Sequence, residues 1–332
     1  MSNLKQQIPD LLSLEQVIEV VFAKGVVEFV TNTKKRRLAV IINRRYFVLS
    51  ILAFIFTVLA LYLAYNYLSG NLLNLAMMYL MALVMAIIIF SERWHRELKI
   101  LAKEINLALV PTITTCFNRL VLYTQDGEQG EAMEAVLRES QLITEGFSNL
   151  IAEDTYSFFD PYQITVRELQ FTKEKQTAKL SLDTRLFHGV LVEVELPMTF
   201  SGITFISTEG NQNDSSHEEF WSDLLVNSEA KEVQFEGNKF EHDLHIATIN
   251  PAEALSILTS DFINNLHDWW LENKENIRIV FNGNKISMLF PEVRIKIGTD
   301  TTSAESAELK KHALKVLKPL WHILTLVDDL KL

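Results

Sequence analysis

Two long runs without charge constrain this chain more than any other feature of its sequence. Residues 46–68 and 72–90 contain no Asp, Glu, Lys, Arg or His, and neither run contains Pro or Gly. At a rise of about 1.5 Å per residue, each run is long enough, or nearly so, to cross a hydrocarbon core of roughly 30 Å as a helix. Only Ser69, Gly70 and Asn71 separate the two runs. The sequence therefore predicts a transmembrane helical hairpin.

Two other interpretations of the first run fit less well. A signal peptide has an apolar region of about 7–15 residues, whereas this run is longer and 45 residues precede it. A buried core helix of a soluble domain does not explain two such runs in immediate succession. The mean hydropathy of +0.11 reflects the same two runs.

Charge is distributed unevenly around the predicted hairpin. Residues 1–45 have a net charge of +4 and the chain after residue 90 has −15, within a total of −11. By the positive-inside rule, this pattern predicts a two-pass membrane protein with both termini in the cytosol. An acidic body excludes a nucleic-acid-binding function. The residues expected to set the topology and to contact lipid headgroups are Lys34, Lys35, Arg36, Arg37, Arg44, Arg45, Arg93, Arg96 and Lys99.

Small residues at four-residue spacing mark one face of each apolar run. Ala60 and Ala64 lie in the first run, and Ala82 and Ala86 lie in the second. Such spacing lets two helices approach closely in lipid, so we expect these alanines to pack the hairpin. Ion paths normally need ionisable groups within the membrane, and both runs lack them. A transporter or channel built from this hairpin alone is therefore not expected.

The patterns along the chain predict an α+β fold in four parts. Residues 1–45 form an N-terminal cytosolic helical segment with a capping box at Ser13, and residues 46–90 form the transmembrane hairpin. Residues 91–150 form a helical stalk that Pro111 breaks or kinks. Residues 151–332 form a cytosolic domain with a mainly antiparallel sheet and helices.

Alternation and turn signals define the elements of the last part. Apolar and polar residues alternate in Val190–Leu196, which is typical of a strand, and Asn282-Gly283-Asn284 is a hairpin turn between two apolar runs. Asn250-Pro251 predicts the start of a single helix over 252–272, whose buried face would include Leu255 and Leu258.

Residues that could carry chemistry do not form a recognisable site. His242 and His245 are three apart in a stretch that is typical of a strand, so they should point to opposite faces. The sole cysteine, Cys116, has no resolving partner and fits a reducing cytosol. Asp328-Asp329 fits a solvated helix face. We therefore predict no catalytic residue, no cofactor and no metal site.

Local motifs in the last half resemble a known family. Phe187-His188-Gly189, the strand that follows it, and Phe200-Ser201-Gly202 resemble a strand pair with phenylalanine-x-glycine at each end. Together with the N-terminal helix and the two-span hairpin, they resemble the bacterial membrane-protein family named domain of unknown function 3137. The resemblance covers about residues 30–332 and implies no established activity. It implies a location in the bacterial inner (cytoplasmic) membrane and a LemA-type membrane protein as a partner.

Three functions remain open at this point. The first is a membrane-anchored cytosolic protein-interaction, scaffold or regulatory module without catalytic activity. Its partners would be the lipid bilayer, another protein and further copies of the same chain in a homo-oligomer. The second is an enzyme or ligand-binding regulator with a pocket lined by His188, His242 or Glu193. The third is an accessory subunit of a membrane transport complex whose polar path lies in another chain.

Overall fold

The computed structural model forms two compact units. The helical unit comprises Ile18–Leu109 with Ile297–Ala313, and the sheet unit comprises Met1–Val17, Val110–Lys296 and Leu314–Leu332. The structure describes residues 11–64, 70–125, 131–143, 149–159, 162–177, 180–208, 229–233, 244–273, 275–295 and 306–330. The predicted α+β class is confirmed, with apolar N-terminal helices followed by an antiparallel sheet with helices.

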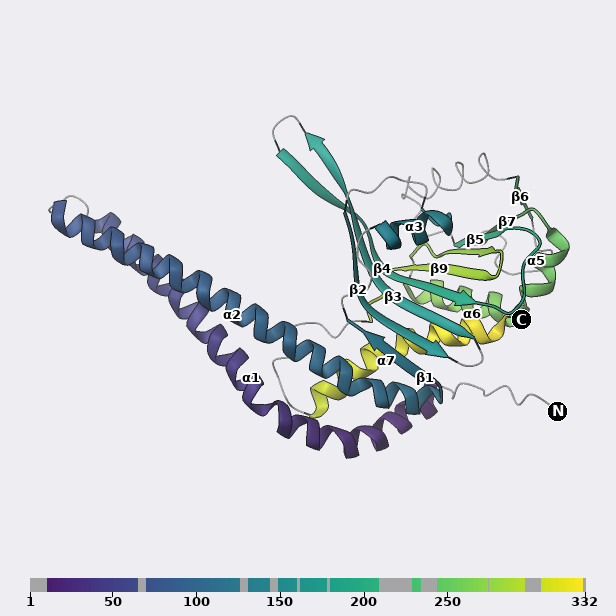
Figure 1. Cartoon of the computed structure of the whole chain (residues 1–332), viewed down its shortest axis with the longest axis horizontal. Coiled ribbons are helices and arrows are strands. Elements are labelled where there is room, and N and C mark those ends of the chain that lie inside the picture. Colours follow the sequence, from purple (N-terminus) through teal and green to yellow (C-terminus); the bar gives the residue numbers. More distant parts are fainter. Residues whose placement is uncertain are drawn as a thin grey trace. The chain divides into compact units, whose positions relative to one another are not determined.

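Two long helices, α1 (Leu11–Ala64) and α2 (Gly70–Phe117), form most of the helical unit (Figure 1). Both are long and apolar enough to cross a membrane, over Thr33–Leu63 and within Asn74–Phe117. Aromatic rings join them near one end of the apolar runs. The ring centroids of Tyr46 and Phe90 are 5.3 Å apart, and those of Phe47 and Trp94 are 5.6 Å apart.

The helices are longer and more continuous than the sequence predicts. Ser13 lies inside α1 and not at its N-terminus, and α1 continues without a break into the first apolar run. A glycine such as Gly25 costs a helix about 1 kcal/mol relative to alanine, which is too little to end it. The prediction that Pro111 could break α2 is wrong, because the helix continues to Phe117. Ile113 and Phe117 beyond the proline are buried, and their packing compensates for the hydrogen bond that proline removes.

A nine-stranded antiparallel sheet forms the core of the sheet unit, in the order β1-β2-β3-β4-β9-β8-β5-β7-β6. The longest pairing joins β3 and β4, which share fifteen residue pairs with a register shift between Phe171 and Thr172. The strands are β1 (Leu120–Thr124), β2 (Asn149–Phe159), β3 (Gln163–Thr177), β4 (Leu180–Glu195), β5 (Thr204–Thr208), β6 (Lys231–Glu232), β7 (Leu244–Thr248), β8 (Arg278–Asn282) and β9 (Lys285–Pro291).

The sheet is covered on both faces, which is why its central strands are buried throughout. The helix α3 (Glu131–Glu139) packs through Met133 and Leu137 on the face that carries Leu289. The opposite face carries Phe290, whose ring centroid lies 5.3 Å from that of Trp269 in α6 (Ser260–Asn273). The C-terminal helix α7 (Ser306–Asp329) lies beside α6 (Figure 1).

The predicted helix over 252–272 is two helices. Asn250 caps α5 (Pro251–Ile257) by accepting a hydrogen bond from the Glu253 N–H at 3.3 Å, as the sequence predicts. The chain then leaves the helix and re-enters it at α6, where the Thr259 hydroxyl accepts from the Phe262 N–H at 3.1 Å. The break shifts the helical phase, so the prediction that Leu255 is buried is wrong and its side chain is 55% exposed.

The two phenylalanine-x-glycine motifs have packing roles. Phe187 stacks on Phe171 with ring centroids 4.9 Å apart, and Phe200 packs edge-on against Phe281 at 5.5 Å. The carboxylate of Glu253 accepts hydrogen bonds from the N–H groups of Ser201 and Gly202, at 2.9 and 3.1 Å. The second motif therefore fixes the loop between β4 and β5 to helix α5.

Candidate functional site

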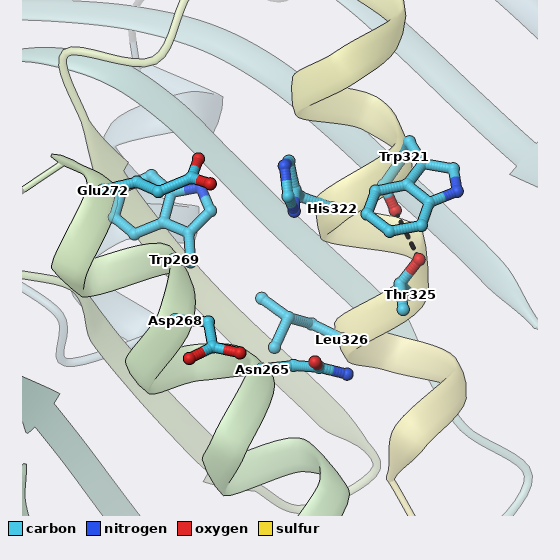
Figure 2. A pocket seen from close by; sticks show the side chains of 8 residues that line it. All are labelled: Asn265, Asp268, Trp269, Glu272, Trp321, His322, Thr325 and Leu326. Atoms are coloured by element: carbon cyan, nitrogen blue, oxygen red, sulfur yellow. Dashed lines mark hydrogen bonds between the residues drawn. The ribbon is translucent and has the colours of Figure 1, made fainter. Parts of the chain in front are cut away.

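A cleft between α6 and α7 is the candidate functional site of the sheet unit. Its volume is about 240 Å³. Figure 2 shows His322 and Leu326 extending from α7 toward α6, with Asp268 and Glu272 along the α6 side. Its lining combines indole rings, one apolar side chain and several polar groups. The lining residues are Asn265, Asp268, Trp269, Glu272, Trp321, His322, Thr325 and Leu326.

Hydrogen bonds at the ends of the helices hold the two walls of the cleft together. The Asn265 amide donates to the carboxylate of Asp329, and the Thr259 hydroxyl donates to the Asp329 carbonyl oxygen at 2.7 Å. Arg119 is 4% exposed and donates to both carboxylate oxygens of Asp328, at 2.6 and 2.8 Å. The prediction that Asp328-Asp329 forms a solvated face is therefore wrong, because both side chains anchor the end of α7.

The cleft has a negative character. Asp268 and Glu272 are exposed on its α6 side, and a single lysine, Lys318, approaches the Glu272 carboxylate at 3.6 Å. Burial lowers the pKa of His322, while nearby Glu272 raises it and Lys318 lowers it. Because the pKa of His322 is lowered, its imidazole is neutral at pH 7 and adds no positive charge to the cleft.

This arrangement suits a positively charged side chain. Trp321 is half-buried and offers part of its ring, and an ammonium or guanidinium group over an indole face gains about 0.5–2 kcal/mol. The carboxylate of Asp268 lines the same cleft and can pair with that charge. Its volume of about 240 Å³ is below the range of about 300–1,000 Å³ that is typical of small-molecule pockets, so it fits a side chain of a protein partner better than a drug-sized molecule.

The basic residues predicted to set the topology fall into two groups. Lys34, Lys35, Arg44 and Arg45 are exposed on α1, as are Arg93, Arg96 and Lys99 on α2. Arg36 and Arg37 are different, since both are engaged within the helical unit. Arg36 pairs with Glu104 and lies 3.7 Å from Glu97, whereas Arg37 is 7% exposed and donates to the Thr33 hydroxyl at 3.1 Å.

The four alanines predicted to pack the hairpin differ in exposure. Ala60 and Ala82 are exposed and Ala86 is half-buried, while the side chain of Ala64 lies outside the described residues. The rings of Phe47 and Trp94 make one contact between the two helices. The packing role of the four alanines remains a prediction.

The histidines and acids considered for a catalytic pocket do not meet. His188 and Glu193 are five residues apart on β4 and lie on opposite faces of the sheet. His188 Nε2 lies 3.2 Å from Glu168, and Glu193 pairs with Arg167. His245 lies 3.1 Å from Glu232 at the surface, whereas His242 is outside the described residues. Within the described ranges, no three His, Cys, Asp or Glu side chains converge on a common centre.

The cleft itself could not be found by sequence motifs. Its walls come from residues 265–272 and 321–326, and neither stretch contains a binding signature. The sequence signals at these positions are Asp268, Trp269 and Glu272 in the first stretch and Trp321 and His322 in the second. That signal is as typical of core packing as of a site.

Comparison with known proteins finds a family match within the second half of the chain. Residues 185–332 match the family described as protein of unknown function (DUF3137), and this stretch includes the whole cleft. No curated protein matches the chain. The crystal structure of the mycobacterial trehalose monomycolate transport factor A aligns with 65% of this chain and 92% of its own, at 8% identity and a TM-score of 0.29. At that TM-score, the two structures do not define a common fold.

Proposed function

Because residues 185–332 match the DUF3137 family, whose description assigns no activity, we propose a function from the geometry of the chain. The chain is a membrane-anchored module whose cytosolic sheet unit binds a protein partner through the α6–α7 cleft, without catalysis of its own. The observation that carries the binding function is the acidic, indole-lined cleft. The observation that carries the anchor is the apolar surface of α1 and α2.

The apolar surface of the two helices supports insertion into a bilayer. From Tyr46 to Ala64, α1 rises about 27 Å, which is close to the hydrocarbon thickness of a membrane. A soluble protein rarely exposes an apolar surface of this extent. The side chains that are at least half exposed in this band include Leu49, Leu52, Ile55, Phe56, Leu59, Tyr62, Leu63, Leu72, Leu75, Met77, Met78, Tyr79, Met81, Met85 and Ile88.

The exposed basic residues support an inner-membrane orientation with both termini in the cytosol. We expect that changing all six basic residues of 34–45 to glutamine loosens or inverts the hairpin. A fluorescent reporter fused after Leu332, which is active only in the cytosol, measures the outcome against a phosphatase reporter that is active only outside. A cytosolic C-terminus in the six-residue variant would mean that Arg93, Arg96 and Lys99 suffice for the topology.

A split of the six residues sharpens this experiment. Lys34, Lys35, Arg44 and Arg45 are exposed and free to contact headgroups, at about 1 kcal/mol each near an anionic surface. Arg36 and Arg37 contact side chains within the helical unit. The four-residue variant should therefore reproduce the topology defect, and the Arg36→Gln/Arg37→Gln variant should not. The reverse result would contradict the assigned roles.

The partner that we propose for the cleft presents a lysine or arginine to it. Charge complementarity with Asp268 and Glu272 favours such a residue, and Trp321 can contact its charged group. A LemA-type membrane protein is the proposed partner, on the family resemblance. The transport-complex function is retained as an alternative only if the partner is polytopic.

We expect that Asp268→Lys/Glu272→Lys reduces recovery of a co-expressed LemA-type protein about tenfold or more, because the substitutions place like charges in the cleft. The full chain is purified from detergent extract by an affinity tag, and the partner is quantified by immunoblotting. Glu229→Lys is the matched control, because Glu229 is also exposed but lies at β6, away from the cleft. Equal recovery with the cleft variant and with the control would refute the cleft as the binding site.

A further inference from the structure

The two edge strands of the nine-stranded sheet differ in how well their sequences protect them against pairing with another chain. At one edge, β6 has only two residues, Lys231 and Glu232, and both are charged and exposed. Short, charged edge strands resist pairing with another chain. At the other edge, β1 has five residues, Leu-Val-Leu-Tyr-Thr, without charge, proline or glycine. The sequence of β1 therefore carries neither the charges nor the proline that protect many edge strands.

Side chains at the β1 edge are exposed on one face and buried on the other. Leu120 and Leu122 are 68% and 58% exposed, whereas Val121 and Tyr123 are 7% and 8% exposed. All five residues pair with β2, from Leu120 opposite Phe159 to Thr124 opposite Thr155. The strand is thus firmly held on its inner side. On its outer side, no strand pairs with it among the described residues.

We propose that β1 pairs with β1 of a second copy of this chain, in antiparallel orientation about a two-fold axis at Leu122. In that register Leu122 lies opposite Leu122, Val121 opposite Tyr123 and Leu120 opposite Thr124. Aliphatic, β-branched and aromatic pairs of this kind stabilise antiparallel strands. Because β1 has no charge, the self-pairing brings no like charges together. The two sheets join into one continuous sheet across the axis.

The chemistry of the strand favours a second copy over an unrelated protein. An isologous contact requires a surface that is complementary to itself, and β1 meets this requirement at every position of the register. The two leucines of each copy bury less than the roughly 1,200 Å² of a stable interface, so the contact is weak in free solution. Confinement of two anchored copies to one membrane raises their effective concentration and favours pairing. Anchoring affects the strength of the dimer and not its register.

Cysteine cross-linking tests the register directly, because the chain has one cysteine, which can be removed as Cys116→Ala. In that background, Leu122→Cys should give a disulfide-linked dimer in membranes treated with copper phenanthroline. Opposed Cα atoms of antiparallel strands are about 4.5–5.5 Å apart, which is within the disulfide range. Leu120→Cys is the matched control. It is equally exposed, but two copies of residue 120 would be about 14 Å apart in this register.

Co-expression of Leu120→Cys and Thr124→Cys chains should restore the dimer, since these positions oppose each other. We expect at least a tenfold greater dimer yield for Leu122→Cys than for Leu120→Cys alone. Equal dimer yields at the two positions would show that the cysteines meet by random collision and not through a fixed strand register, and would overturn the proposal. A cross-linked product with a different protein, without a homodimer, would also overturn it. Tryptophan fluorescence of each variant verifies that a missing dimer does not result from unfolding.

Discussion

Gly189→Ala should lower the free energy of unfolding of the sheet unit by about 3 kcal/mol or more, at the upper end of overpacking effects. Gly189 lies in β4 between Leu169 of β3 and Pro291 of β9. A Cβ atom at this position would lie 2.2 Å from the carbonyl oxygen of Phe290 and 2.9 Å from the Cα of Pro291. Both are backbone atoms of a central strand, so the substitution forces strands apart and does not only rotate a side chain.

The measurement is thermal unfolding of the full chain in detergent micelles, followed by near-ultraviolet circular dichroism. A loss of this size corresponds to a midpoint about 6–12 °C lower for a unit of this length. Gly283→Ala is the matched control. Gly283 has a φ of +57°, and a Cβ atom there has no heavy atom within 4 Å, so alanine costs only about 1–2 kcal/mol of backbone strain. If the control destabilises as much as Gly189→Ala, close strand packing at Gly189 is not the cause.

The hairpin and the central strands could be predicted because local signals determine them. Length and absence of charge suffice to identify the apolar helices, whatever they pack against. The β8–β9 pairing follows from a two-residue turn at Gly283 and Asn284 between apolar runs. In each case the information lies within about twenty residues of contiguous sequence.

Strand β1, the start of β2 and the break before α6 could not be predicted from local signals. The strand β1 begins two residues after α2 ends. Its first three residues, Leu-Val-Leu, are apolar, so the local sequence predicts that the helix continues. Residues 120–124 and 149–150 were expected in a helical stalk, and both are strands because pairing with a neighbouring strand outweighs local propensity. The break before α6 also lacks glycine or proline. Its only signal was Thr259 as a potential cap, followed by Asp261 in the first turn.

The α6–α7 cleft and the buried polar contacts depend on pairs of residues that are distant in sequence. Arg119 and Asp328 are 209 positions apart, and Asn265 and Asp329 are 64 apart. No sequence periodicity links residues so far apart. The sequence pattern around Asp328-Asp329 therefore predicts a solvent-exposed helix face. Only the packing of α7 beside α6 brings the partners together and gives the cleft its walls.

Glu168→Ala should destabilise the sheet unit by about 3–5 kcal/mol, which is the range for removing one member of a buried pair. The Glu168 residue is 1% exposed, and its two carboxylate oxygens have separate partners. One oxygen lies 3.2 Å from His188 Nε2, and the other accepts a hydrogen bond from the Ile295 N–H at 3.0 Å. Arg294 Nη1 also lies 3.8 Å from the first oxygen. The alanine variant removes all three interactions and leaves buried polar groups without this acceptor.

The same pair of residue types at the surface provides the matched control. His245 and Glu232 are 3.1 Å apart, but the Glu232 side chain is 51% exposed, so Glu232→Ala should cost less than about 1 kcal/mol. Both variants are measured by thermal unfolding of the full chain, with Glu168→Gln as an intermediate that keeps an acceptor for the Ile295 N–H. The expected order of stability loss is Glu168→Ala, then Glu168→Gln, then Glu232→Ala. Similar losses for the buried and the surface variant would show that Glu168 is not what holds the segment at Ile295 against the sheet.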